Sequence, residues 1–174
     1  SIDAGFYSIA DAGIFGRIWG DLNADGLRDL TEPFIENIQI DLLSVDGSGT
    51  TTLVSSVNTD VNGNYSFTNL SAGNYKVEIN DLQSNELTTK DAGDDGLDSD
   101  FVIISKQSDL LTLIANQVIN NIDGGLFKRA TIGDYVWNDS NKNGIQDADE
   151  VGLAGVSITI NDVNSTFTQT TTTD

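Results

Sequence analysis

Apolar and polar residues alternate with a period of two along several short stretches of the chain. Residues 14–19 and 38–43 show this alternation in the first third, and residues 132–137 and 156–160 show it again near the end. Because successive side chains of a strand point to opposite faces, the alternation predicts β-strands with one buried face. No segment carries a convincing 3.6-residue period, so we expect almost no helix.

Similar strand signals recur at short intervals between these stretches. Residues 36–45 and 51–58 are joined by the tight-turn sequence Asp46-Gly-Ser-Gly, and residues 59–67 form a turn that leads into a strand. Further strands are predicted at residues 75–79, 101–105, 110–114 and 118–123. Many short strands separated by Gly, Asn and Asp turns indicate an all-β fold of the β-sandwich class.

The sequence also repeats itself. Trp19 and Trp137 are 118 residues apart, and so are the corresponding residues of the loops that follow them. Residues 2–7 resemble residues 122–127 at an offset of 120, and we interpret both as the closing strand of a repeat. The predicted domains are therefore the end of a preceding repeat (residues 1–12), one complete repeat (13–129) and the first half of a following repeat (130–174).

A twelve-residue loop begins two residues after each tryptophan. The first copy, Asp21-Leu-Asn-Ala-Asp-Gly-Leu-Arg-Asp-Leu-Thr-Glu32, has oxygen-bearing side chains at positions 1, 3, 5, 9 and 12 and glycine at position 6. Calcium takes about six to eight oxygen ligands, so this spacing predicts a calcium site, with position 7 supplying a backbone carbonyl. The predicted ligands are Asp21, Asn23, Asp25, the Leu27 carbonyl, Asp29 and Glu32 in the first loop, and Asp139, Asn141, Asn143, the Ile145 carbonyl, Asp147 and Glu150 in the second.

The flanks of these loops decide what kind of site they form. One such loop alone is often only a solvated turn, but two complete matches at a constant offset favour calcium. A helix-loop-helix site needs amphipathic helices on both sides, whereas strand patterns enter and leave both loops. The preceding residues Trp19 and Trp137 are interpreted as core residues, with a sugar-stacking platform as the alternative.

Another acidic segment spans residues 90–100. It places five carboxylates close together, those of Asp91, Asp94, Asp95, Asp98 and Asp100. Like charges at such spacing are unfavourable unless water or a cation screens them. A hydrated loop and a second ion site both fit this pattern.

Composition narrows the possible functions. A formal charge of −19 argues against nucleic acid and anionic membranes as partners, because both would repel the chain. The absence of Cys, Met and His removes thiol chemistry, soft-metal sites and the commonest general base, so we do not expect an enzyme. No apolar run is long enough to insert into a membrane.

Together these motifs resemble a known family. The first loop with its tryptophan, Thr59-Asp-Val-Asn-Gly-Asn-Tyr-Ser-Phe67 with Asn69-Leu70, and Ala72-Gly-Asn-Tyr75 are similar to the B repeats of Sdr-type bacterial surface proteins. The resemblance implies calcium binding, a Greek-key or prealbumin-like β-sandwich, and tandem stalk modules that hold a ligand-binding region away from the cell. An Asp-Ser-Asp at this position belongs to the family's calcium pattern, which favours Asp98 and Asp100 as further ligands.

The sequence thus predicts an extracellular structural module, a calcium-rigidified spacer of a protein on a bacterial cell surface or secreted from it. Calcium sites of this kind fill without competition where free calcium is millimolar, and that concentration is found outside cells. The expected partners are neighbouring repeats of the same chain. The alternative is a self-assembling filament or matrix subunit, in which copies of the chain complete one another's sandwiches by strand exchange.

Overall fold

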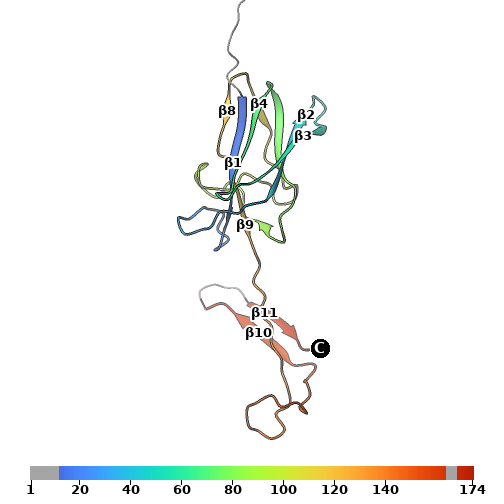
Figure 1. Ribbon diagram of the computed structural model, residues 1–174. Helices are drawn as coiled ribbons and strands as arrows, with labels where there is room; N and C mark the ends of the chain where they lie inside the picture. The colour runs from blue at the N-terminus through green and yellow to red at the C-terminus, as the bar shows by residue number, and fades with distance from the viewer. Residues whose placement is uncertain (1–11, 164–167) are drawn as a thin grey trace, which may run out of the picture. The chain divides into compact units, whose positions relative to one another are not determined.

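The computed structural model describes residues 12–163 and 168–174, and the chain divides into two compact units after Arg129. The closing strand predicted near the N-terminus, at residues 2–7, lies outside the described residues. Each unit is described by itself below (Figure 1). All regular elements in the described ranges are strands, so the all-β prediction is confirmed.

Unit 1 contains two sheets. β1 (Ala12–Gly20) lies inside the five-stranded sheet, where it pairs antiparallel with β4 and parallel with β8 and β9. The other strands of this sheet are β4 (Asn64–Leu70), β6 (Glu86–Leu87), β8 (Val118–Ile119) and β9 (Gly124–Phe127). The second sheet is antiparallel, in the order β3-β2-β5-β7, with β2 (Gln39–Val45), β3 (Thr51–Asn58), β5 (Gly73–Ile79) and β7 (Leu111–Leu113).

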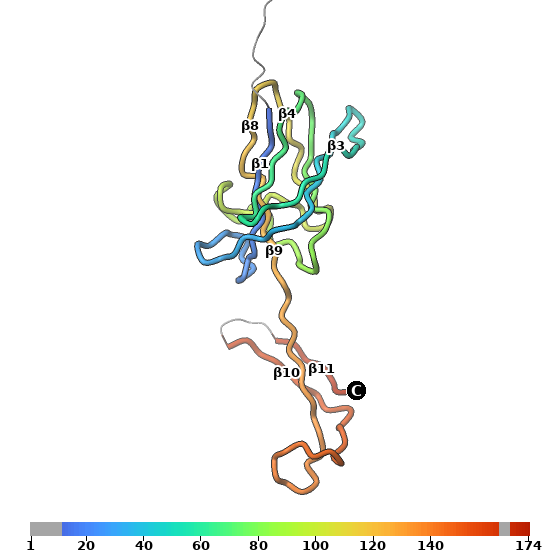
Figure 2. Tube along the Cα trace, in the orientation of Figure 1, coloured from blue at the N-terminus to red at the C-terminus, as the bar shows by residue number. Residues whose placement is uncertain are grey.

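The core lies between the two sheets. Alternate residues of the central strands have no exposed surface, as the alternation in the sequence predicts. Ile40 and Leu42 on β2 pair with Ile79 and Val77 on β5, and Ile14 on β1 belongs to the same buried cluster. Two sheets that share one apolar layer form a sandwich, and Figure 2 follows the chain through it.

In its described residues, unit 2 has one small sheet. β10 (Ser157–Asn161) and β11 (Thr168–Thr172) pair antiparallel. The predicted strand at residues 156–160 is confirmed by β10, and the Ser/Thr-rich tail forms a strand in its described part.

Two strand predictions are wrong, and the strand predicted at residues 118–123 is limited to the two residues of β8. Residues 101–105 form a turn, in which Lys106 N donates to the Val102 carbonyl, because only Phe101 of this apolar run enters the core while Ile104 is 95% exposed. Residues 132–137 contain a single bridge, Trp137 with Gly152, and no strand. The equivalent strand of unit 1, β1, is held by three neighbouring strands, and the described part of unit 2 supplies none of these.

Candidate metal centre

The loop of unit 1 starts where β1 ends and is closed by its first and last acidic residues. Asp21 and Glu32 are 1% and 8% exposed. The Asp21 carboxylate accepts from Asp25 N at 3.3 Å and Gly26 N at 2.8 Å, and Glu32 accepts from Leu22 N at 2.7 Å and Asp29 N at 2.9 Å. Each oxygen has a second lone pair, so these backbone donors fix the carboxylates and leave acceptor capacity for an ion.

The middle of the loop draws polar side chains together. Asn23 and Asp25 each accept from the backbone N–H two residues ahead, at 3.1 and 2.8 Å. The Asn23 amide also donates to Asp25 Oδ2 at 2.9 Å and to Asp29 Oδ2 at 3.5 Å. An N–H donor thus bridges two carboxylates, which is the electrostatic role that a cation would take over.

Unit 2 reproduces this arrangement 118 residues later. Asp139 accepts from Asn143 N and Gly144 N at 3.1 and 2.9 Å, and Glu150 accepts from Ser140 N and Asp147 N at 2.8 and 3.2 Å. An asparagine amide again approaches the ninth-position carboxylate, since Asn141 donates to Asp147 at 2.7 Å.

The backbone conformation is also repeated. Positions 4 and 6 are left-handed in both loops, with φ of 57° at Ala24 and 87° at Gly26, and 60° at Lys142 and 75° at Gly144. A non-glycine residue in this region costs free energy, so its recurrence at equivalent positions shows that both loops have one conformation.

The acidic segment of unit 1 packs directly against the first loop. Leu27 forms a bridge with Asp98, and Arg28 N donates to the Leu97 carbonyl at 2.7 Å. Thr88 donates its hydroxyl to Asp21 at 2.5 Å. Asp98 is 3% exposed and accepts from Gly93 N at 3.0 Å. The two predicted calcium segments, far apart in sequence, are therefore neighbours in space.

Asp100 lies in a second group with Asp123, which belongs to neither acidic motif of the sequence. Asp123 N donates to Asp100 Oδ2 at 2.7 Å, Asp100 N donates to the Asp123 carbonyl at 2.8 Å, and Arg17 N donates to Asp123 Oδ1 at 2.7 Å. Burial raises the pKa of Asp100 to about 7 and that of Asp123 to about 6; a backbone N–H bond opposes the rise in each. The charges of Asp95 and Asp98 raise the pKa of Asp100 further. Asp123 follows the closing-strand residue Ile122, and no ligand spacing in the sequence points to it.

The donor set fits calcium, because every side chain predicted as a ligand in the two loops carries an oxygen donor and position 7 presents a carbonyl. In the residues described, no three acidic side chains converge on one point as in an assembled ion site. The carboxylates are held instead by loop N–H groups. The fit therefore rests on the donor types, the loop conformation and the buried carboxylates.

The fold of unit 1 defines a β-sandwich module, and each of the two units carries a twelve-residue acidic loop with the same spacing. The chain belongs to the SdrD B-like domain family, whose model matches residues 12–126 and again 130–174.

Its similar relatives include the serine-aspartate repeat-containing protein D of Staphylococcus aureus strain Newman, 35% identical over the whole chain, and protein F of Staphylococcus epidermidis strain ATCC 12228 / FDA PCI 1200, 36% identical over the whole chain. The chain spans only 13% and 10% of the length of these two proteins.

Solved structures with some likeness include a streptococcal ancillary pilin, with 14% identity and a TM-score of 0.46, covering 95% of this chain and 48% of the pilin. The shaft pilin SpaA from Lactobacillus rhamnosus GG shows 10% identity and a TM-score of 0.44, covering 90% and 63%. The family match points to no family of enzymes. In the described residues no helix is long and apolar enough to cross a membrane.

Proposed function

We propose that this chain is a calcium-rigidified spacer module of a bacterial surface protein. The observation that carries the proposal is the repetition of one loop conformation at an offset of 118 residues, with the same acidic anchors at positions 1 and 12. Turns that only connect strands are free to diverge, whereas two loops that bind the same ion must keep their ligands in place.

Calcium would act here through stability. In unit 1 the loop, the segment from Thr88 to Asp98 and the end of β1 meet around the buried Asp21. An ion bound at this junction would tie the three together and offset repulsion among the 27 acidic residues. At a free concentration ten times the dissociation constant, each site would add about 1.4 kcal/mol to the free energy of unfolding.

The test is thermal unfolding of the chain in excess EDTA, in millimolar calcium and in millimolar magnesium. We expect calcium to raise the melting temperature and magnesium to raise it less, since magnesium requires stricter octahedral geometry. Asp21→Ala should remove the effect on unit 1, and the matched control Glu36→Ala, which removes an exposed carboxylate outside the loops, should keep it. Equal melting temperatures in EDTA and calcium would contradict the proposal.

Assembly by strand exchange is a second candidate function. It is favoured by unit 2, where Ile158 and Ile160 on β10 are 42% and 37% exposed although their counterparts on β2 are buried. A strand from a neighbouring copy would cover them, and so would a strand of the same polypeptide. Mixing two distinguishable forms of the chain tests strand exchange, which requires mixed oligomers to form, and their absence would contradict it.

A further inference from the structure

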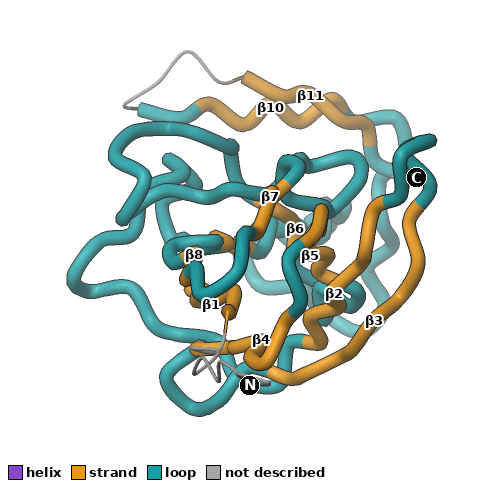
Figure 3. The backbone as a smooth tube through the Cα atoms, turned by 90° about the horizontal axis from the view of Figure 1, so that it is seen from above, coloured by secondary structure: helices purple, strands orange, loops and turns teal. Residues whose placement is uncertain are grey.

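Within the described residues, one side of the unit 1 sandwich carries two long sheet edges. β3, with eight residues, ends the four-stranded sheet, and β4, with seven, ends the five-stranded sheet. The opposite ends of the same sheets are β7, with three residues, and β6, with two. Figure 3 shows β3 as the outer neighbour of β2.

These long edges lack the charges that usually protect an edge. β3 and β4 contain no charged residue, although 20% of the chain is charged and about three of fifteen residues would be expected. The short edge strand β6 carries a charge itself, since its Glu86 pairs with Arg129, whereas near β3 and β4 the carboxylate of Asp60 lies in the turn that joins these two strands. The contrast marks the β3 side as able to accept another strand.

β3 is also accessible. All its residues are exposed except the half-buried Val57, and Leu53 and Val54 are 57% and 49% exposed. A β-bulge at Val54 interrupts its pairing with β2, and pairing is regular again from Ser55 onward. In an antiparallel pair every second residue directs its N–H and C=O groups away from the neighbouring strand. The regular stretch after the bulge therefore offers free backbone groups.

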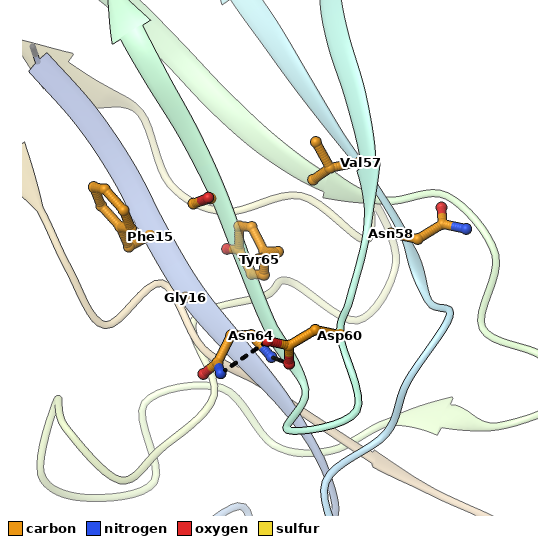
Figure 4. Close-up of a pocket in the computed structure, with 8 residues that line it drawn as sticks. Phe15, Gly16, Val57, Asn58, Asp60, Asn64 and Tyr65 are labelled. Atoms are coloured by element: carbon orange, nitrogen blue, oxygen red, sulfur yellow. Dashed lines mark hydrogen bonds between the residues drawn. The ribbon is translucent and has the colours of Figure 1, made fainter.

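A groove of about 520 Å³ runs beside this stretch. It lies between the two edges, and Figure 4 shows residues that line it on β1, β4 and β3, among them Phe15, Tyr65 and Val57. A strand added to β3 would lie along the mouth of this groove and cover the half-buried Phe15 and Val57, whereas Tyr65 is already buried, at 4% exposed.

The occupant that fits this edge is a second copy of the chain. With a charge of −19, most surfaces of one copy repel those of another, whereas a neutral strand meets its own copy without like-charge contact. Antiparallel pairing of identical strands also satisfies two-fold symmetry, because each copy donates and accepts the same hydrogen bonds. We propose that β3 pairs with β3 of a second copy, which joins the two four-stranded sheets into one continuous sheet and makes the module a lateral contact between neighbouring molecules.

Sedimentation velocity of the full chain over a concentration series tests the pairing. We expect a mass above the 18.6 kDa of one copy at high concentration, and stronger association at higher salt because salt screens the net charge. Ser55→Lys on β3 should weaken association at least tenfold, and Thr112→Lys on the short edge strand β7 should leave it unchanged. A monomer at every concentration overturns the proposal, and so does association that survives Ser55→Lys.

Disulfide trapping locates the contact, because the chain contains no cysteine. Single cysteines at Ser55, Ser56 and Val57 bracket the expected two-fold axis, where opposing Cα atoms lie about 4.5–5.5 Å apart, within reach of a disulfide. Under mild oxidation we expect crosslinked dimers at one or two of these positions and at least tenfold less with Thr112→Cys. Equal crosslinking at Thr112 or at Thr170 on β11 would overturn the assignment to β3. This inference stands independently of calcium binding.

Discussion

Replacing Gly26 by alanine tests whether the acidic loop is built into the body of unit 1. Gly26 has φ of +87°, and an added Cβ would lie 2.7 Å from both the Ala92 Cβ and the Thr89 carbonyl oxygen. The left-handed conformation costs alanine about 1 kcal/mol, and the overpacking costs about 1–3 kcal/mol more. We therefore expect Gly26→Ala to lower the free energy of unfolding by about 2–4 kcal/mol.

The chain supplies a matched control at Gly49. This glycine, in the turn between β2 and β3, has φ of +84° and nothing within 4 Å of an added Cβ, so Gly49→Ala should cost only about 1 kcal/mol. Urea unfolding followed by the fluorescence of the buried Trp19 measures the stability of both variants. The measurement is made in a Trp137→Phe background, which leaves Trp19 as the only tryptophan. If Gly26→Ala costs no more than Gly49→Ala, the loop does not pack against residues 88–92 and the reasoning fails.

In the calcium-free chain, stability should fall as pH rises from about 4 to about 7. The folded carboxyls have raised pKa values, about 7 for Asp100 and about 6 for Asp123, against the usual 3.8, so the folded state binds more protons in this window. Asp100→Asn keeps an acceptor for the backbone of Asp123 and should flatten a plot of melting temperature against pH; an unchanged slope would refute the assignment. Phe101→Ala should cost about 3–5 kcal/mol because the ring is fully buried, whereas Ile104→Ala, at 95% exposure, should stay within about 0.5 kcal/mol in the same urea assay. Similar losses of unfolding free energy for both variants would contradict the turn at residues 101–105, because they would require Ile104 to be buried as well.

The local pattern of apolar and polar residues was sufficient to predict a strand that has one face in the core. The period of two predicted β1 and β2, and the β-branched run flanked by turn residues predicted β3 from Thr51 to Asn58. The same reasoning failed at residues 101–105, because an apolar run cannot show that only its first residue reaches the core. Periodicity reports which residues are apolar, and packing decides which of them are buried.

The candidate site also has a part that the sequence predicts and a part that it does not. Ligand spacing within twelve residues is local, so both loops could be predicted from the sequence. The contacts that join the loop to the rest of unit 1 are not local: Thr88 is 67 residues from Asp21, and Asp123 is 23 residues from Asp100. Such pairings depend on the order of strands in the sheets, which the alternation of single strands does not specify.

Stretching single molecules of the full chain in millimolar calcium and in EDTA measures whether calcium makes this module mechanically stiff. The unfolding of unit 1 can be recognised by its length, since 118 residues from Ala12 to Arg129 extend to roughly 400 Å. We expect a higher unfolding force for unit 1 in calcium than in EDTA, and we expect this difference to be lost in Asp21→Ala and retained in Glu36→Ala. The same unfolding force in calcium and in EDTA would contradict this expectation.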